Sequence, residues 1–298
     1  MAKLFAKKFT HISPVWLQIK LNQDEITTRI EGTHDVDSEW IADIRKVNPD
    51  IKIVPRVIFD SWMHSELLAL LTNAKLPSQI GKQLSELALE HSFDGFTIEI
   101  WSSFATQQKV ELAEILIKIS AHFKKHKLQL ILVVPPPLHH GNQVGIFVRE
   151  DLERLAPYVT FFSVMTYDYS SMYRPGPNSP IQWVRKCVEA LVPNRKSPNR
   201  AKLLMGMNFY GNSYTPNGGR AIIGHEFLDI LNEHKPKIIW DDIHEEHFVE
   251  YKSHMGRNRA FFPTLMSIKK RLELLEQLGT GVSIWEIGQG LDYFFEMF

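Results

Sequence analysis

The sequence predicts an α/β fold built on a parallel sheet of the kind that closes into a (β/α)8 barrel. Short apolar or β-branched runs alternate with longer amphipathic stretches, which is typical of βαβ units. The run Leu130–Val134 is apolar throughout, as expected of a strand that helices cover. A length of 298 residues allows one such barrel with an insertion.

We interpret seven runs as strands, each followed by loop residues. They are Phe9–Gln18, Ile51–Phe59, Phe93–Trp101, Leu128–Pro135, Thr160–Tyr167, Lys202–Tyr210 and Gly281–Glu286. Amphipathic helices are expected between them at Asp37–Val47, Pro77–Glu90, Lys109–Lys125, Ile181–Leu191 and Leu265–Leu278. Gly279 follows the last helix, at the position where a glycine in the left-handed conformation commonly ends a helix. A closed parallel barrel needs eight strands, so one strand is unaccounted for.

The interval between Tyr210 and Gly281 is too long for a single helix and its loops. Short β-like runs separated by polar turns lie within it, at Lys237–Trp240, His247–Lys252 and Asn258–Phe262. We therefore expect one barrel over residues 1–298, with a loop and a small α+β insertion over residues 211–264.

Composition and charge disfavour several classes of function. The 34 Lys and Arg residues balance 34 Asp and Glu residues, and no stretch gathers the basic side chains that a nucleic acid would need. The single cysteine, Cys187, cannot form an intrachain disulfide, and cysteine chemistry is not expected. The amino terminus has no apolar run of signal-peptide length, and no later segment is long and apolar enough to predict a transmembrane helix.

Motifs for metals and cofactors are weak. In His244-Glu245-Glu246-His247 the histidines lack the i,i+4 spacing of His-Glu-x-x-His, so a helix would not place the two rings as that zinc motif does. We interpret this run as a solvated surface. No glycine pattern matches a phosphate loop, and we expect neither a cofactor nor a metal.

The strand Phe93–Trp101 carries the functional argument. Its period of two places Phe96, Ile98 and Ile100 on one face and Thr97, Glu99 and Trp101 on the other. If the apolar face meets helices, the second face points into the barrel, with Trp101 at the carboxyl end where barrel enzymes keep their sites. A buried Glu99 needs polar partners, either structural ones or a ligand, and we expect Tyr167 or Asp168.

This strand resembles the signature strand of glycoside hydrolase family 18, Asp-Gly-x-Asp-x-Asp-x-Glu, with Asp94-Gly95 at its start. Thr97 and Glu99 stand where the family has its two inner aspartates, and Trp101 stands where it has the proton-donating glutamate. Three more runs resemble the sixth, seventh and eighth strands of the family. They are Met165-Thr166-Tyr167-Asp168, Gly206–Gly211 and Gly281–Glu286.

The resemblance implies a TIM (β/α)8-type barrel whose first strand is absent from this chain, because the second-strand position falls at Phe9–Gln18. Residues 1–8 then correspond to the end of the first helix. Strands two and eight would be left as unpaired edges. We expect a truncated start, with a signal segment and the first strand in a longer product.

Hydrolysis in family 18 is substrate-assisted and needs an acid and a carboxylate that orients the acetamido group. An indole at position 101 is a donor but no usable acid near neutral pH. Glu99 lies two residues down the strand, about 6.6 Å from the required place. We therefore predict no catalytic residues, and a lectin-like protein that recognises amino sugars or oligosaccharides at the barrel mouth.

The predicted sugar-binding residues follow from the resemblance and from the stacking and hydrogen-bonding groups that a sugar needs. They are Trp285, Trp101, Glu99, Tyr167, Asp168, Met165, Asn208, Tyr210 and Trp16. Core packing of the aromatic rings and a bond from Asp168 to the barrel rim are the structural alternatives. The alternative function is a glycoside hydrolase that uses Glu99, Asp168 or Glu286 on an unusual N-acetylated substrate.

Further runs, among them Ser13–Leu17, Tyr173–Asn178 and Val282–Tyr293, look like the stabilin-interacting chitinase-like subgroup of the family. This resemblance implies a second partner, a sorting receptor of the stabilin type. It also implies a secreted or lysosomal protein.

Overall fold

The computed structural model describes residues 1–298 except 25, 60–61, 63, 105–107 and 255. The described chain divides into two compact units. The amino-terminal unit comprises Ala2–Pro135 and Ile146–Ser163, and the carboxy-terminal unit comprises Pro136–Gly145 and Val164–Phe298, with Met1.

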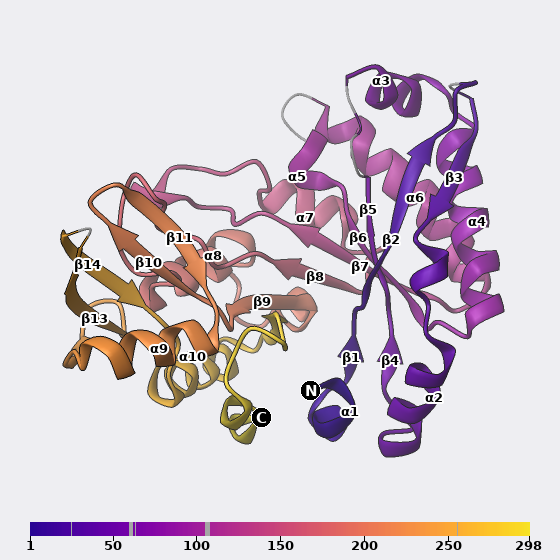
Figure 1. Cartoon of the computed structure of the whole chain (residues 1–298). Helices are drawn as coiled ribbons and strands as arrows, with labels where there is room; N and C mark the ends of the chain where they lie inside the picture. The colour runs from indigo at the N-terminus through magenta and orange to yellow at the C-terminus, as the bar shows by residue number, and fades with distance from the viewer. Residues whose placement is uncertain (25, 60–61, 63, 105–107, 255) are drawn as a thin grey trace. The chain divides into compact units, whose positions relative to one another are not determined.

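Strands of the amino-terminal unit follow one another in the order β3-β2-β5-β6-β7-β8 (Figure 1). Their bounds are β2 Val15–Leu21, β3 Thr28–Glu31, β5 Arg56–Ile58, β6 Gly95–Glu99, β7 Gln129–Val134 and β8 Phe161–Val164. The pairings of β2 with β5, β5 with β6 and β6 with β7 are parallel. A separate two-stranded parallel pair joins β1 (His11–Ile12) to β4 (Lys52–Ile53). All five strands predicted in this unit are therefore present, two of them in two pieces.

The two faces of β6 differ as its period of two predicts. Ile98 is fully buried beside its register neighbour Val57, and the ring of Phe96 meets Phe123 on a covering helix at 5.5 Å. Thr97 and Glu99 lie on the opposite face. The side chain of Glu99 therefore points away from the helices, which is the orientation that the sequence predicts.

Helices flank this sheet. Their bounds are α1 Ala2–Phe5, α2 Ser38–Val47, α3 His64–Thr72, α4 Leu76–His91, α5 Trp101–Phe104, α6 Lys109–Lys125 and α7 Arg149–Leu155, with 3-10 turns η1 Ala6–Lys8 and η2 Thr33–Asp35. The longest, α4 and α6, pack against each other. Asp37 caps α2 by accepting the Trp40 N–H at 2.8 Å, where the sequence predicts that helix to begin.

Strand β3 corrects one expectation about the edge of the sheet. It pairs antiparallel with β2, from Gln18 opposite Glu31 to Leu21 opposite Thr28, on the side away from β5. The edge of strand two that was expected to be unpaired is therefore partly covered by a hairpin partner that the sequence did not reveal. Residues 2–8 are helical, as expected, and the truncated start stays a prediction.

The carboxy-terminal unit contains the parallel pair β9 (Leu203–Asn208) and β15 (Gly281–Trp285). Between them in sequence lies a five-stranded antiparallel sheet in the order β11-β10-β14-β13-β12 (Figure 1). Its strands are β10 Gly211–Thr215, β11 Gly218–Ile222, β12 Ile238–Asp241, β13 Glu246–Ser253 and β14 Gly256–Phe261. This sheet is the antiparallel insertion that the fold class predicts. Its last three strands match the predicted runs, whereas β10 and β11 were not predicted.

Helices of this unit are α8 Ile181–Leu191, α9 Gly224–His234 and α10 Leu265–Leu278, with 3-10 turns η3 His140–Asn142, η4 Pro198–Lys202 and η5 Asp292–Met297. Helices α8 and α10 pack against each other, and both have the predicted bounds. Gly279 caps α10 with a φ of 70°, in the left-handed region where glycine is favoured. The boundaries 1–298 and 211–264 stay predictions.

Candidate functional site

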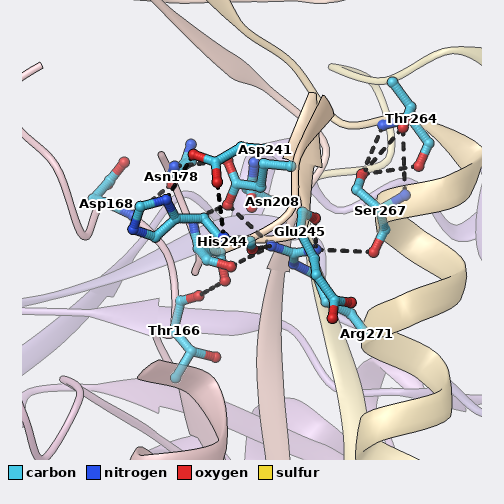
Figure 2. A network of polar contacts seen from close by, with 12 residues as sticks. Thr166, Asp168, Asn178, Asn208, Asp241, His244, Glu245, Thr264, Ser267 and Arg271 are labelled. Carbon is cyan, nitrogen blue, oxygen red and sulfur yellow. Dashed lines mark hydrogen bonds and ion pairs between the residues drawn. The ribbon is translucent and has the colours of Figure 1, made fainter. Parts of the chain in front are cut away.

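The carboxy-terminal unit brings together six of the predicted residues, at the ends of β8, β9 and β15. Asp168 follows β8 and is exposed, with a left-handed φ of 58°. Its N–H donates to Asn178 Oδ1 at 2.6 Å, and its Oδ1 accepts the Tyr210 O–H at 2.6 Å. Two hydrogen bonds therefore hold a strained backbone and fix the direction of the carboxylate, and Figure 2 shows the one to Asn178.

Tyr210 is buried beneath this carboxylate. Burial, together with the negative charge and hydrogen bond of Asp168, raises the pKa of Tyr210 far above its ordinary value. Burial also raises the pKa of Tyr214, on β10, to about 12, with the charge of Asp168 adding to the effect. Both phenols therefore remain protonated donors near neutral pH.

Gly206 makes room for Tyr167 beside β9. A Cβ at position 206 would lie 2.7 Å from Tyr167 Cε1 and 2.7 Å from the Val164 carbonyl oxygen. The Tyr167 ring meets Tyr210 edge to face at 6.2 Å. A residue larger than glycine at position 206 would displace the Tyr167 ring.

Trp285 and Asn208 are register neighbours at the ends of β15 and β9. Asn208 is buried, and its Nδ2 donates to the Tyr210 carbonyl at 2.8 Å. Trp285 is half-buried, its carbonyl accepts the Phe209 N–H at 2.8 Å, and its peptide bond to Glu286 is cis. Met165 is half-buried too, so Met165, Tyr167, Asp168 and Trp285 are the solvent-accessible members, and Asn208 and Tyr210 support them.

In the amino-terminal unit, Glu99 pairs with Arg56, and the expected contact with Tyr167 or Asp168 stays a prediction. Arg56 on β5 donates to Glu99 Oε2 through Nε at 2.8 Å and through Nη2 at 2.5 Å. The expected partners, Tyr167 and Asp168, belong to the other unit. Sequence reasoning missed Arg56 because pairing between neighbouring parallel strands depends on register, which the pattern of one strand does not give. A sugar contact from Glu99 stays a prediction.

Trp101 is 0% exposed, which corrects the expectation of a stacking role. Strand β6 ends at Glu99, and Trp101 begins α5. Its Nε1 donates to the Ile146 carbonyl at 3.2 Å, and Phe147 packs edge-on against the ring at 5.2 Å. No face of this ring is open to a sugar, so we leave Trp101 out of the binding set.

Trp16 lies at an irregularity in the pairing of β2 with β5, between Val15 and Leu17. Its ring contacts Trp40 on α2 at 5.6 Å and Phe93 at 6.2 Å. These contacts place it in an aromatic cluster beside a covering helix. Trp16 is half-buried, and its place in the binding set stays a prediction.

The run 244–247 is not the solvated surface that the sequence suggested. Glu246 is 8% exposed, and its two carboxylate oxygens accept the backbone N–H groups of Asn178 at 2.9 Å and Ser179 at 2.6 Å. Arg271, also buried, donates to Glu246 Oε1 at 3.0 Å. Burial lowers the pKa of Arg271 from its ordinary value, and the Glu246 charge opposes that effect. Figure 2 shows how this network extends from Asp168 to α10.

The cavity beside this ion pair is too small for a sugar. It is lined by Asn178, Asn208, Glu246 and Arg271 among others and has a volume of about 10 Å³, no more than one water molecule needs. Across the described ranges no group of three or more His, Cys, Asp or Glu side chains could hold a metal ion. In the same part of the chain, no helix is long and apolar enough to cross a membrane.

The family model for glycosyl hydrolases family 18 matches residues 3–290. The chain belongs to this family. A chitinase from Chromobacterium violaceum is a similar solved structure, with a TM-score of 0.83 and 18% identity over 99% of this chain and 92% of the other. The spore cortex-lytic enzyme SleL of Bacillus megaterium matches with a TM-score of 0.81 and 20% identity, over 100% of this chain and 68% of that one.

A third relative is a family 18 chitinase from Cycas revoluta in complex with (GlcNAc)3. It matches with a TM-score of 0.80 and 14% identity, over 99% of this chain and 93% of the other. These family 18 structures share the barrel fold with this chain, which places its parallel strands in a (β/α)8-type barrel.

Proposed function

We propose that this family 18 member is a non-catalytic, lectin-like protein that binds amino sugars or their oligosaccharides. One observation supports the proposal: Trp101, which the resemblance places at the family's proton-donor position, is fully buried, while Trp285, Tyr167 and Asp168 remain accessible. The half-buried Trp285 ring suits the C–H face of a pyranose, and the Asp168 carboxylate suits its hydroxyl or amide groups.

The chemistry of the remaining carboxylates supports a role without catalysis. Glu99 accepts two hydrogen bonds from the Arg56 guanidinium, which occupy one of its two oxygens. Glu286 accepts the Gly288 N–H at 3.0 Å, which turns its carboxylate back toward its own chain. A missing general acid costs about 100- to 10,000-fold in rate.

The second candidate is a glycoside hydrolase that uses Asp168 or Glu99 on an unusual N-acetylated sugar. The exposure of Asp168 favours keeping this candidate, because a catalytic carboxylate must reach its substrate. Both candidates predict a ligand with N-acetylglucosamine units, the sugar present in the Cycas revoluta complex.

A protein partner is the third element of the proposal. The runs Ser13–Leu17 and Tyr173–Asn178 resemble the stabilin-interacting chitinase-like subgroup. A sorting receptor of that type would bind the protein as cargo in a secretory or lysosomal route, and this role is compatible with sugar binding.

Titration of (GlcNAc)3 against tryptophan fluorescence and calorimetry tests the binding proposal, with cellotriose as the matched control that lacks acetamido groups. We expect a dissociation constant in the micromolar-to-millimolar range. The absence of saturable binding would overturn the proposal. A fluorogenic chitobioside tests the second candidate: turnover that disappears in Asp168→Asn or Glu99→Gln would make the protein a hydrolase.

A further inference from the structure

The segment Asn178–Ser179 connects two parts of the carboxy-terminal unit. On one side it holds the residues after β8: Asn178 Oδ1 accepts the Asp168 N–H, the Asn178 carbonyl accepts the Tyr169 N–H at 2.9 Å, and Ser179 Oγ donates to the Thr166 carbonyl at 2.6 Å. On the other side its two N–H groups donate to Glu246. A shift of this segment would therefore move Asp168.

Arg271 holds Glu246 in place from α10. Its guanidinium donates to the carboxylate and to the carbonyl oxygens of Glu245, at 2.8 Å, and Ser267, at 3.0 Å, and it also donates to Ser179 (Figure 2). The Arg271 and Glu246 side chains are 7% and 11% exposed. A buried ion pair is weak evidence for net stability, because desolvation offsets much of the Coulombic attraction. Its position suggests a second role.

We infer that Glu246 and Arg271 are positioning residues for the sugar site: through Asn178 they fix the backbone of Asp168 and thereby the direction of its carboxylate. This inference rests on the proposed function for the meaning of Asp168, but the positioning itself is a property of the unliganded protein. The φ of Asp168 lies in the left-handed region, which costs free energy for a residue other than glycine. The hydrogen bonds of the network stabilise this conformation, and we expect the backbone of Asp168 to relax when they are lost.

Two substitutions interrupt the network at different points. Glu246→Gln removes the charge and leaves one oxygen for two N–H donors, and Asn178→Ala removes the acceptor of the Asp168 N–H. We expect each to weaken (GlcNAc)3 binding by about tenfold, the equivalent of one good hydrogen bond. Because both act through the same contact, the double variant should lose little more than either single variant.

Arg200→Lys is the matched control. Arg200 is also buried, and it donates to the carbonyl oxygens of Val192 and Leu278 in the same unit, away from Asn178. This control should lower the free energy of unfolding and leave sugar affinity unchanged. If it weakens binding as much as Glu246→Gln does, or if the effects of Glu246→Gln and Asn178→Ala are additive, the pair is merely structural and the inference fails.

Hydrogen exchange of the Asp168 amide separates this inference from the proposed function. We expect this amide to exchange about tenfold faster in Glu246→Gln and in Arg271→Lys than in the wild type, with no change in Arg200→Lys. Unchanged exchange overturns the inference. If the wild type binds no sugar but the exchange result holds, the proposed function fails and the positioning role stands. If Glu246→Gln does not fold, Asn178→Ala and Arg271→Lys decide the question.

Discussion

The phenol of Tyr210 donates a hydrogen bond to the Asp168 carboxylate across 2.6 Å, and this contact joins the end of β9 to the residue that follows β8. The donor is buried and the acceptor side chain is exposed. One oxygen of the Asp168 carboxylate is therefore occupied by a hydrogen bond within the protein. The other oxygen, on an exposed side chain, is the one that we propose for ligand binding.

Tyr210→Phe removes this donor and keeps the ring. We expect (GlcNAc)3 binding to weaken several-fold, because solvent replaces only part of a hydrogen bond worth about 1.5–3 kcal/mol to a charged group. Calorimetric titration measures the change. Tyr173→Phe is the control, since residue 173 is 91% exposed. Equal affinities for Tyr210→Phe and the wild type would show that the orientation of Asp168 is unimportant to the ligand.

Trp285→Ala removes the proposed stacking surface. Aromatic contacts contribute about 0.5–1.5 kcal/mol beyond buried area, so we expect affinity to fall by about twofold to tenfold or more. Calorimetry is preferable to fluorescence here because the substitution removes a fluorophore. Trp40→Phe, in the aromatic cluster with Trp16, should leave affinity unchanged. An unchanged affinity in Trp285→Ala would remove Trp285 from the site.

The parallel strands could be predicted because each is a short run of residues that must be buried on a helix-covered face. Strands β10 and β11 could not, because glycine and polar residues in Gly211–Thr215 and Gly218–Ile222 have low strand propensity. These two strands form through pairing with each other and of β10 with β14. Tertiary pairing outweighed local preference there.

The accessible residues of the candidate site could be predicted from short motifs. The buried residues Glu246 and Arg271, which hold the segment next to Asp168 in place, could not. Glu246 lies in a polar run, and Arg271 lies on a helix rich in charged side chains, so each resembles a surface residue. Only the fold brings the two together, across 25 positions of sequence. Trp101 was predicted at the end of the strand, facing the barrel interior, and this was wrong because β6 ends two residues earlier than its apolar pattern suggests.

Stability should depend on pH through partly buried histidines. Burial lowers the pKa values of His11, His122 and His247 from 6.5 in the folded protein, so the unfolded chain binds protons first as pH falls. The free energy of unfolding should therefore be highest above about pH 6.5 and fall as pH drops from there toward the lowered pKa values.

Denaturant titrations on either side of about pH 6.5 test this dependence. His11→Asn, which removes a ring bonded to Gln129, should flatten the slope. His34→Asn is the control because that side chain is 83% exposed, and it should leave the slope unchanged. A free energy of unfolding that rises as the pH drops below about 6.5 would contradict this prediction.

Trp101→Glu, which places a carboxyl group where the resemblance puts the family's proton donor, should not produce hydrolysis. The indole is fully buried against Phe147, so the change deletes a large core side chain, at about 3–5 kcal/mol, and buries a carboxyl group in its place. Against a total stability of about 5–15 kcal/mol, this substitution leaves a marginal fold. Thermal unfolding and the fluorogenic chitobioside assay measure the two outcomes.

Trp101→Phe separates the two causes of the lost stability in Trp101→Glu, the smaller core side chain and the buried carboxyl group. It keeps a six-membered aromatic ring but removes the rest of the indole, including the N–H that bonds to the Ile146 carbonyl, so we expect a smaller cost of about 1–3 kcal/mol. A Trp101→Glu protein that is as stable as Trp101→Phe and cleaves the chitobioside would mean that position 101 can still face a substrate. Because the ring contacts Ile146 and Phe147 within the amino-terminal unit and is fully buried, we expect destabilisation without activity instead.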